Sequence, residues 1–244
     1  MTRSATLNIE CAVQTAPRAK PRLLETLAAL ARAGFPSPLV VADYAGRGCY
    51  QTYLRTMLLL ARTASDADYW LICEDDIEPA AGLDVWLSSD HSHLPVEPGE
   101  MGLISLYTCA SNHRTGRTGW NVIERLPHHT HIAIPWGALA YLWPVSLAME
   151  YLASPRKPTD REGTDHHVGV WLRERGIPAY CHSPSLVRHT GIVPWSDTSL
   201  ACKLASDADR QCAEWVPDLS QAIEGERINA WKTERYAASA SVLD

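Results

Sequence analysis

The first 76 residues of this chain alternate between short apolar segments and longer segments with helical spacing, and this order limits the fold more than any other feature. The apolar segments have the length of strands and occupy residues 7–13, 38–43 and 69–73. Between them, leucines recur at helical spacing from Leu23 to Leu30 before a helix-ending glycine, Gly34, and residues 52–64 are rich in Leu and Met. An order of strand, helix, strand, helix, strand predicts right-handed crossovers. The expected fold is therefore an α/β three-layer sandwich with a mostly parallel central sheet and helices on its faces.

The rest of the chain predicts further elements of both kinds. Strands are expected over residues 101–107 and 178–182, and helices over residues 82–87, 144–153 and 166–175. Beyond Trp195 the pattern weakens, with peripheral helices expected at 201–213 and 219–236 and a frayed tail at 237–244. No internal repeat and no change in composition marks a second domain, so a single domain is predicted over residues 1–236.

Composition narrows the class of protein. The chain has 244 residues, of which 46% are hydrophobic and 20% charged, as in a soluble globular protein. Its apolar runs are shorter than the roughly 20 residues of a membrane span, and no signal peptide is recognisable at the N-terminus. We therefore expect a cytoplasmic protein, in the host cytoplasm if a phage encodes it. The net charge of −6 argues against a non-specific nucleic-acid binder. Seven cysteines without a CxxC spacing are expected to be reduced, mostly as core residues.

A run of three acids follows the third expected strand. The apolar residues 69–73 stop at Glu74, Asp75 and Asp76, and Ile77 resumes the apolar character. Neighbouring carboxylates repel one another and partial burial adds a desolvation cost, so a cation or a strong set of donors is expected to offset both. Oxygen ligands at a strand end suit a hard ion such as Mg²⁺ or Mn²⁺. The alternative is a solvated acidic turn.

Other polar residues follow the first two expected strands. Thr15 and Arg18 come after the first strand, and Asp43 ends the second. Ligands of open α/β sheets bind at the carboxyl ends of the strands. These residues and the acidic triplet are therefore expected to converge on one edge of the sheet.

The second half of the chain contains three further candidate segments. Residues 108–119 are polar and include Arg114 and Arg117, which predicts a surface loop that is either a solvated hairpin or a lid over an acceptor. Trp136 offers a plane for stacking, and Gly137 lets a ligand approach the backbone. Thr164 and Asp165 have the pattern of a cap at the start of a helix.

A histidine cluster offers a different reading. His128, His129 and His131 could bind a transition metal, although no Cys or Asp stands at a matching spacing nearby. The other interpretation of this segment is a polar edge of a strand or loop.

Taken together in chain order, these segments resemble glycosyltransferases of the GT-A fold, in particular small bacterial or phage enzymes. The resemblance extends over about residues 7–195, and it depends more on the order of the motifs than on any one of them. It comprises the polar strand ends, the triplet Glu74-Asp75-Asp76, the Gly-Ala-Tyr segment from Gly137, an acid before a helix and a late His-x-Gly at His189. Members of this family use a nucleotide-sugar donor and a divalent metal held by a DxD motif, which some bacterial members carry as Glu-Asp-Asp.

The resemblance implies a role for each matching residue near the donor. Asp76 is similar to the direct metal ligand, and His189 to the late histidine that completes the metal shell. Glu74 and Asp75 would contact the ribose or a metal-bound water. Asp43 would contact the base or ribose, and Thr15 and Arg18 would line the nucleotide.

On the acceptor side, the resemblance leaves open which acid would be the general base. Asp165 is similar to the general base of inverting members, but Asp160 and Glu162 precede it and the usual adjacent Glu-Asp pair is absent. A retaining enzyme would not need this base. Trp136, Gly137, Arg114 and Arg117 are the residues expected to contact the acceptor.

The expected activity is transfer of a hexose from a nucleoside diphosphate-sugar, with a UDP-sugar as the expected donor, to an acceptor hydroxyl. Residues 1–100 would form a nucleotide-sugar-binding half, residues 101–195 an acceptor-binding half, and residues 196–236 peripheral helices. The acceptor is either a cytosolic glycan or a hydroxymethylated base in DNA, and the negative net charge weighs against DNA. Two alternatives remain: a nucleotide-sugar-binding module without transfer activity, and a zinc hydrolase using the histidine cluster.

Overall fold

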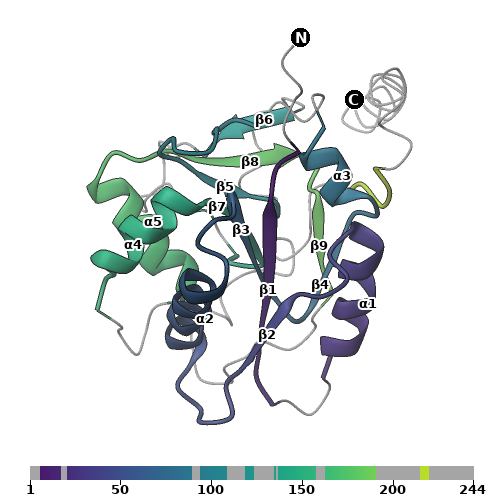
Figure 1. The fold of residues 1–244 in the computed structure, drawn as a ribbon, viewed down its shortest axis with the longest axis horizontal. Helices are drawn as coiled ribbons and strands as arrows, with labels where there is room; N and C mark the ends of the chain where they lie inside the picture. Colours follow the sequence, from purple (N-terminus) through teal and green to yellow (C-terminus); the bar gives the residue numbers. More distant parts are fainter. Residues whose placement is uncertain are drawn as a thin grey trace, which may run out of the picture.

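A seven-stranded sheet runs through the middle of the molecule, with helices on both of its faces (Figure 1). The computed structural model describes residues 6–17, 21–89, 94–108, 119–123, 135, 137–157, 163–190 and 215–219. The strands of the sheet are β1 (Ile9–Thr15), β2 (Leu39–Ala42), β3 (Tyr69–Glu74), β5 (Leu103–Ser105), β6 (Gly119–Val122), β7 (Ala140–Pro144) and β8 (Ala179–Ser183). The helices are α1 (Leu23–Ala33), α2 (Cys49–Thr63), α3 (Leu83–Leu87), α4 (Val145–Ala153) and α5 (Thr164–Glu174).

The strand order of the sheet is β2-β1-β3-β7-β5-β8-β6. Strand β1 pairs in parallel with β2 and β3, and β5 pairs in parallel with β8. Strands β7 and β6 run antiparallel to their neighbours. Five of the seven strands therefore share one direction, which confirms the predicted α/β fold with a mostly parallel central sheet.

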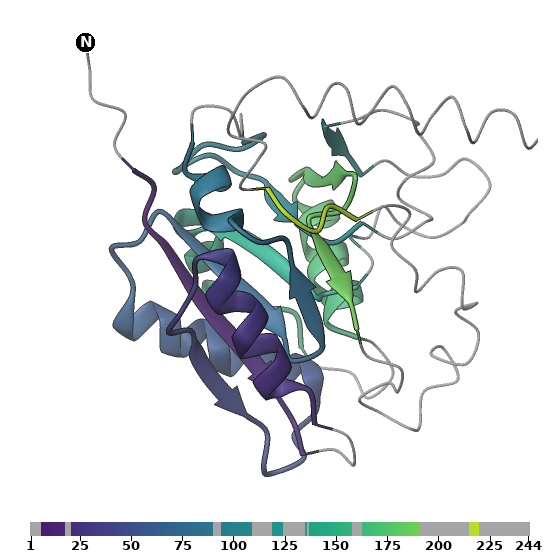
Figure 2. The ribbon, with the colours of Figure 1, turned by 90° about the vertical axis from the view of Figure 1, so that its right-hand side faces the viewer.

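The chain changes direction across the sheet at β1. It passes from β1 to β2 on one side through α1, and then crosses β1 through α2 to reach β3 on the other side. Helix α1 consequently lies with α3 on one face, and α2 lies with α4 and α5 on the opposite face (Figures 1 and 2). In open α/β sheets, ligands bind at such a switch point, outside the carboxyl ends of the strands. Thr15 and Glu74, the last residues of β1 and β3, border this position.

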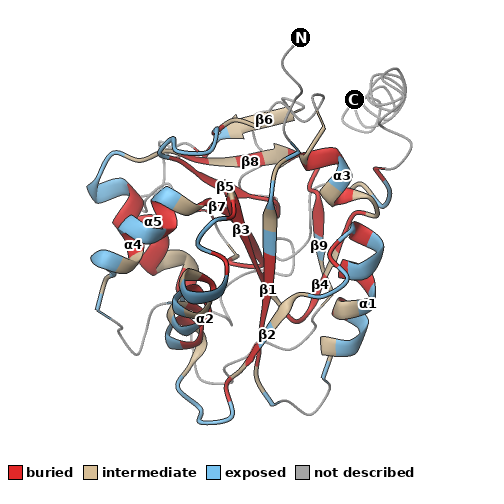
Figure 3. Ribbon diagram, in the orientation of Figure 1, coloured by how far each residue is buried: buried red, intermediate tan, exposed pale blue. Residues whose placement is uncertain are grey.

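Each face of the sheet carries its own hydrophobic core (Figure 3). Strand β7 serves both, because successive side chains of a strand point to opposite faces. Ala140 and Leu142 belong to the core on the α1 side, and Tyr141 and Trp143 to the core on the α2 side. All four are fully buried. The continuous apolar run of this strand is what a strand covered on both faces requires.

Helix α1 ends where the sequence predicts. Gly34 adopts the left-handed conformation, with φ of 103°, and its N–H points to the carbonyls of Ala31 and Leu30. A Cβ at this position would lie 2.5 Å from Cβ of Asp84, so the position excludes a side chain by space as well as by backbone conformation.

A small two-stranded ribbon lies beside α1, apart from the main sheet (Figure 2). It pairs β4 (Ile77–Pro79) with β9 (Val187–His189) in antiparallel register, with Ile77 opposite His189 and Glu78 opposite Arg188. The ribbon joins the residues that directly follow the acidic triplet to a segment 110 positions later. It therefore brings the triplet and the late histidine together.

The structure corrects two local expectations. Strand β5 covers only Leu103–Ser105 of the predicted 101–107. The helix cap expected from Thr164 and Asp165 is wrong, because Gly163 occupies the N-cap position of α5 and no side chain caps the helix. Asp165 lies inside the first turn, where its carboxylate can reach another segment.

Several predicted segments lie outside the described residues. These are Arg18, the loop with Arg114 and Arg117, the cluster of His128, His129 and His131, Trp136, Asp160, Glu162 and the peripheral C-terminal segments at 201–213 and 220–244. Within the described ranges, no helix is both long enough and apolar enough to cross a membrane. The division of the chain into functional halves stays a prediction.

Candidate functional site

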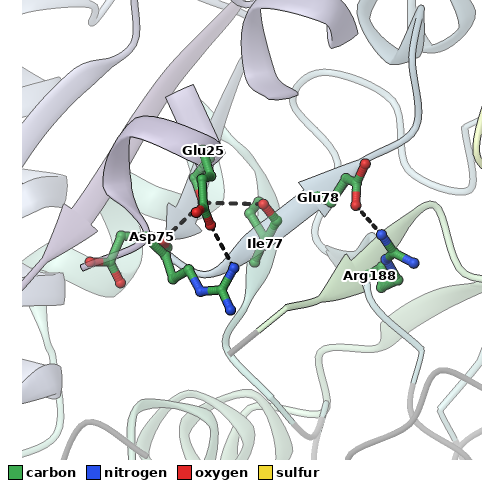
Figure 4. Close-up of polar contacts among 7 residues, drawn as sticks. Glu25, Asp75, Ile77, Glu78 and Arg188 are labelled. Carbon is green, nitrogen blue, oxygen red and sulfur yellow. Dashed lines mark hydrogen bonds and ion pairs between the residues drawn. The ribbon is translucent and has the colours of Figure 1, made fainter. Parts of the chain in front are cut away.

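The three acids at the carboxyl end of β3, Glu74, Asp75 and Asp76, point to three different places. The turn that carries them is clamped by its surroundings: the Thr26 hydroxyl of α1 donates to the carbonyls of Asp75, at 2.8 Å, and Ile77, at 3.1 Å (Figure 4). On the ribbon side, the Thr190 N–H donates to the carbonyl of Asp76 at 2.7 Å. A turn fixed in this way can direct successive carboxylates apart, which lowers their mutual repulsion.

Asp75 points inward. Its side chain is completely buried, and its carboxylate accepts a hydrogen bond from the Thr15 hydroxyl at the end of β1. The bond ties the ends of β1 and β3 together at the switch point. Both residues were predicted to contact the donor, and the structure gives them a contact with each other.

Asp76 points toward the ribbon, where it meets His189. Oδ2 of Asp76 lies 3.3 Å from Nε2 of His189, with 6% of the aspartate side chain and 23% of the histidine side chain exposed. The structure thus brings together the two residues predicted to hold a metal, although 113 positions separate 76 from 189 in the chain. The pair lies just beyond the carboxyl end of β3, which borders the switch point.

This pair fits two neighbouring ligands of one divalent ion. Two ligand atoms about 2.1 Å from an ion and at right angles lie about 3.0 Å apart, close to the separation found here. Among the residues that the structure describes, no three His, Cys, Asp or Glu side chains converge as a complete metal site. Mg²⁺ is commonly held by one or two carboxylates together with water and substrate phosphates, so such an ion does not require three converging protein ligands.

Glu74 points to the opposite side, toward α2 and α5. Its Oε1 accepts a hydrogen bond from the Cys49 thiol at 3.7 Å, and the same sulfur lies 3.2 Å from the Thr164 hydroxyl. Burial raises the pKa of the Cys49 thiol, and the neighbouring Glu74 carboxylate raises it further, so the thiol stays protonated and can donate. Gln14 of β1 donates to this sulfur at 3.9 Å. Cys49 therefore links four elements, and nothing in the sequence pattern identified it.

Asp165 lies at the start of α5, next to Thr164. Its Oδ2 accepts the Gly137 N–H at 3.1 Å, and its Oδ1 accepts the His166 N–H at 2.8 Å. Burial raises the pKa of the Asp165 carboxyl, against the opposing effect of these N–H donors. A carboxylate with a raised pKa at a partly exposed position is suited to accept a proton.

Asp43 orders the loop that follows β2. Its carboxylate accepts the N–H groups of Arg47, at 3.0 Å, and Gly48, at 2.9 Å, and only 5% of the residue is exposed. Burial alone would raise the pKa of Asp43, but hydrogen bonds from this loop and from Thr52 outweigh it and hold the pKa below its usual range. The contacts of Asp43 within the protein are thus those of a loop anchor.

Gly137 is required by its surroundings. It has φ of +77°, and a Cβ at this position would lie 3.0 Å from Cε1 of Tyr107. The close neighbour of this glycine is therefore the Tyr107 ring, and the N–H of Gly137 holds Asp165. Its neighbour Trp136 lies outside the described residues, as do Arg18, Arg114 and Arg117.

Comparisons with known proteins give matches only at the level of structure. No protein-family model matches the chain, and no curated protein matches it in sequence. Among the solved structures that match is the catalytic domain of Drosophila beta1,4galactosyltransferase 7 in complex with xylobiose, at 13% identity and a TM-score of 0.44, covering 83% of this chain and 81% of that one.

Two other matches have a similar level of likeness. A glycosyltransferase involved in glycosylation of the major capsid of PBCV-1 is 8% identical over 72% of this chain and 83% of that one, with a TM-score of 0.41. The A197 protein from STIV is 9% identical over 76% of this chain and 86% of that one, with a TM-score of 0.44. Glycosyltransferases are thus among the structures that match. Likeness at this level carries no functional conclusion, which has to come from the side chains of the site.

Proposed function

We propose that this chain is a metal-dependent glycosyltransferase that moves a sugar from a nucleoside diphosphate to an acceptor hydroxyl. The observation that supports it best is the pair formed by Asp76 and His189, 3.3 Å apart at the switch point of the sheet. The triplet's first acid, Glu74, lies beside this pair in sequence and turns toward the helix that carries Asp165. A metal pair and a carboxylate with a raised pKa are two groups that an inverting transfer of this kind uses.

In this proposal Asp76 and His189 hold Mn²⁺ or Mg²⁺. When bound, the ion neutralises negative charge that builds up on the leaving nucleoside diphosphate. Glu74 contacts the donor, a UDP-sugar, and Thr15, Arg18 and Asp43 line its nucleotide. Asp75 acts by holding the end of β1 through Thr15, since its carboxylate is fully buried.

Asp165 is the proposed general base. The acceptor hydroxyl gives its proton to the carboxylate as the hydroxyl oxygen attacks the sugar, and the Gly137 N–H keeps the carboxylate oriented. Trp136, Gly137, Arg114 and Arg117 form the acceptor side. A base of this kind belongs to a single displacement, so the product should have the inverted anomeric configuration, which NMR of the product would determine.

The acceptor that we favour is a glycan. The chain carries a net charge of −6, which opposes the phosphate backbone of DNA. A hydroxymethylated base in DNA is the second acceptor to be included in the test.

The first experiment is the substitution Asp76→Asn. It keeps the size of the side chain and removes its charge, so binding of Mn²⁺ in the presence of UDP should weaken at least tenfold. Metal-stimulated donor hydrolysis and sugar transfer should fall on the order of 100-fold, the loss typical of removing one group that stabilises transition-state charge. Calorimetry measures the first effect, and mass spectrometry of products from a panel of donors, glycans and hydroxymethylated DNA measures the second.

Asp66→Asn is the matched control, because Asp66 is an exposed acid just before β3, away from the carboxyl end of that strand. This variant should behave as the wild type does. Full activity of Asp76→Asn would contradict the proposal. Binding of UDP and Mn²⁺ without turnover on any acceptor would favour a binding module, and stoichiometric zinc in the purified protein would favour a hydrolase.

A further inference from the structure

A charged cavity of about 440 Å³ opens between α1 and the β4–β9 ribbon, and His189 forms part of its lining. We call it the arginine groove, and its charged lining residues are Arg22, Glu25, Arg32, Glu78 and Arg188. From Arg22 to Arg32 it follows α1 for ten positions, which is about 15 Å along a helix. Because His189 belongs both to the groove and to the proposed metal pair, a ligand in the groove has one end beside the reacting centre.

The groove has an excess of positive charge. Three guanidinium groups face two carboxylates, and one of these, Glu78, is shared. Arg188 bonds to Glu78 from the neighbouring strand of the ribbon (Figure 4), and Arg32 approaches the same carboxylate at 3.7 Å. A single carboxylate does not neutralise two guanidinium groups, so a ligand with a negative charge is favoured here.

Two of the three arginines contact neighbouring side chains before any ligand binds. The Arg188 guanidinium lies 4.3 Å from the centre of the Trp215 ring while it bonds to Glu78. At the other end, Arg22 lies 2.6 Å from Glu25 on the same helix. Side chains that are already ordered lose little rotamer entropy on binding, which favours affinity.

The mixture of groups identifies the kind of ligand. Over about 15 Å, one nucleic-acid strand carries about four phosphates, far more charge than the excess of one in the groove balances. The two glutamates would also repel such a backbone. Guanidinium donors alternating with carboxylate acceptors suit the hydroxyl groups of a sugar chain, and the excess charge suits one acidic sugar.

We propose that the arginine groove binds an acceptor oligosaccharide that carries an acidic sugar, with a carboxylate or phosphate between Arg32 and Arg188. The oligosaccharide lies along α1 with one end at His189, and its reacting sugar extends from there across the edge of the sheet toward Asp165. This inference rests on the proposed transferase function and specifies its acceptor.

Matched acidic and neutral probes test the inference. Trigalacturonate and a hyaluronan tetrasaccharide are each compared with their methyl esters by calorimetry, in the presence of UDP and Mn²⁺. Since the ester removes only the charge, at least one of the two acids should bind roughly tenfold more tightly than its own ester. Equal binding of acid and ester for both probes would overturn the proposal, and so would a short oligodeoxynucleotide that binds more tightly than either acid.

Two substitutions in the groove should act in opposite directions. Arg32→Gln removes one positive charge and should abolish most of the tenfold preference, whereas Glu78→Gln removes the shared carboxylate and should strengthen acid binding several-fold. Arg62→Gln is the control, because Arg62 is an exposed arginine on α2, across the sheet from the groove. If both groove variants bound the acidic probes more weakly, or both bound them more tightly, the charge balance of the groove would be contradicted.

Donor hydrolysis by the wild-type protein separates this inference from the proposed function. If hydrolysis requires metal but the acid preference is missing, the groove inference alone fails. If the acid preference is present and the wild type neither hydrolyses nor transfers sugar from any donor, the transferase proposal fails.

Discussion

At the scale of single residues, the three carboxylates of the acidic triplet point in different directions, which lowers the repulsion between them. Glu74 turns to a protonated thiol, Asp75 to a threonine hydroxyl and Asp76 to a histidine. Each carboxylate thus has a donor or a cation-binding partner of its own. Among these three contacts, the one between Asp76 and His189 has the spacing of two ligands of one ion, so the proposal assigns the metal to a single member of the triplet.

The raised pKa of Asp165 gives a prediction for the pH dependence of transfer. A base must be ionised to act, so kcat/KM should fall as pH drops through the raised pKa of Asp165. The midpoint of this fall, the acid limb of the pH profile, should lie above the usual aspartate pKa of about 3.9. Asp165→Asn should reduce kcat on the order of 100-fold or more and remove this limb. Initial rates from pH 4 to 9 measure both effects. Saturating donor and acceptor give kcat, and limiting concentrations give kcat/KM.

Stability measurements on Asp165→Asn distinguish loss of the catalytic base from loss of folded protein as the cause of a lower rate. With its folded pKa raised, the ionised carboxylate of Asp165 costs folding free energy, and this cost appears as pH rises from the unfolded pKa through the folded one. Relative to the wild type, Asp165→Asn should therefore gain stability as pH rises over that interval. An unchanged acid limb in the variant would exclude Asp165 as the base.

Sequence located these carboxylates but did not give their directions. The position of a residue at the end of a strand follows from the apolar pattern, which is why Asp43, Glu74 and Asp76 were all expected at one edge. The direction of a side chain depends on tertiary neighbours. Asp43 is predicted to contact the donor, and the structure adds bonds from its carboxylate to the backbone of its own loop, which the strand pattern does not predict. The sequence pattern does not indicate a linking role for Cys49, because its partners come from separate elements.

At the scale of elements, the sequence predicts the C-terminal ends of helices better than it predicts helix starts or short strands. Gly34 marks the end of α1 in sequence and in structure, because a left-handed residue there has a strong compositional signal. The ribbon strands β4 and β9 have three residues each, too few for any periodicity to be visible. Their pairing depends on contacts between distant segments, which no local pattern encodes.

Two glycines at helix ends give a matched test of local packing. Gly34 and Gly176 both have positive φ, but a Cβ at Gly34 would meet Asp84 at 2.5 Å, whereas a Cβ at Gly176 would meet no atom within 4 Å. Gly176→Ala should cost about 1 kcal/mol from backbone strain alone. Gly34→Ala should cost roughly 1 to 3 kcal/mol more, because Asp84 must also move.

Urea unfolding of the two variants measures this difference directly as a change in the free energy of unfolding. The change is read against the wild type in the same buffer. Equal costs at the two positions would show that α3 gives way to a side chain at the end of α1 without loss.

At the scale of the whole molecule, the sheet couples the two cores. Trp143 of β7 packs in the α2 layer, where its Nε1 donates to the Tyr53 hydroxyl at 2.6 Å, and the adjacent Leu142 packs in the α1 layer. Neighbouring residues of one strand thus anchor opposite layers. Loss of either layer removes support from the strand that holds the other.

This coupling predicts one cooperative transition. Leu142→Ala should destabilise the protein by about 2 to 5 kcal/mol, the usual cost of truncating a fully buried leucine. Far-UV circular dichroism should report the same shifted midpoint as tryptophan fluorescence, to which Trp70, Trp143 and Trp171 in the other layer contribute. Midpoints that separate in the variant would mean that the two layers unfold independently.

The ribbon has a consequence for the order of events during synthesis. Glu78 and Arg188 are 110 positions apart, so closing this loop costs about 4 kcal/mol of chain entropy before the ribbon contributes any contact. The ribosome synthesises Asp76 long before His189, because synthesis proceeds from the N-terminus. The nascent chain therefore holds Asp76 without His189 while 113 further residues are added, and the paired site can first exist only after all seven strands of the main sheet have been synthesised.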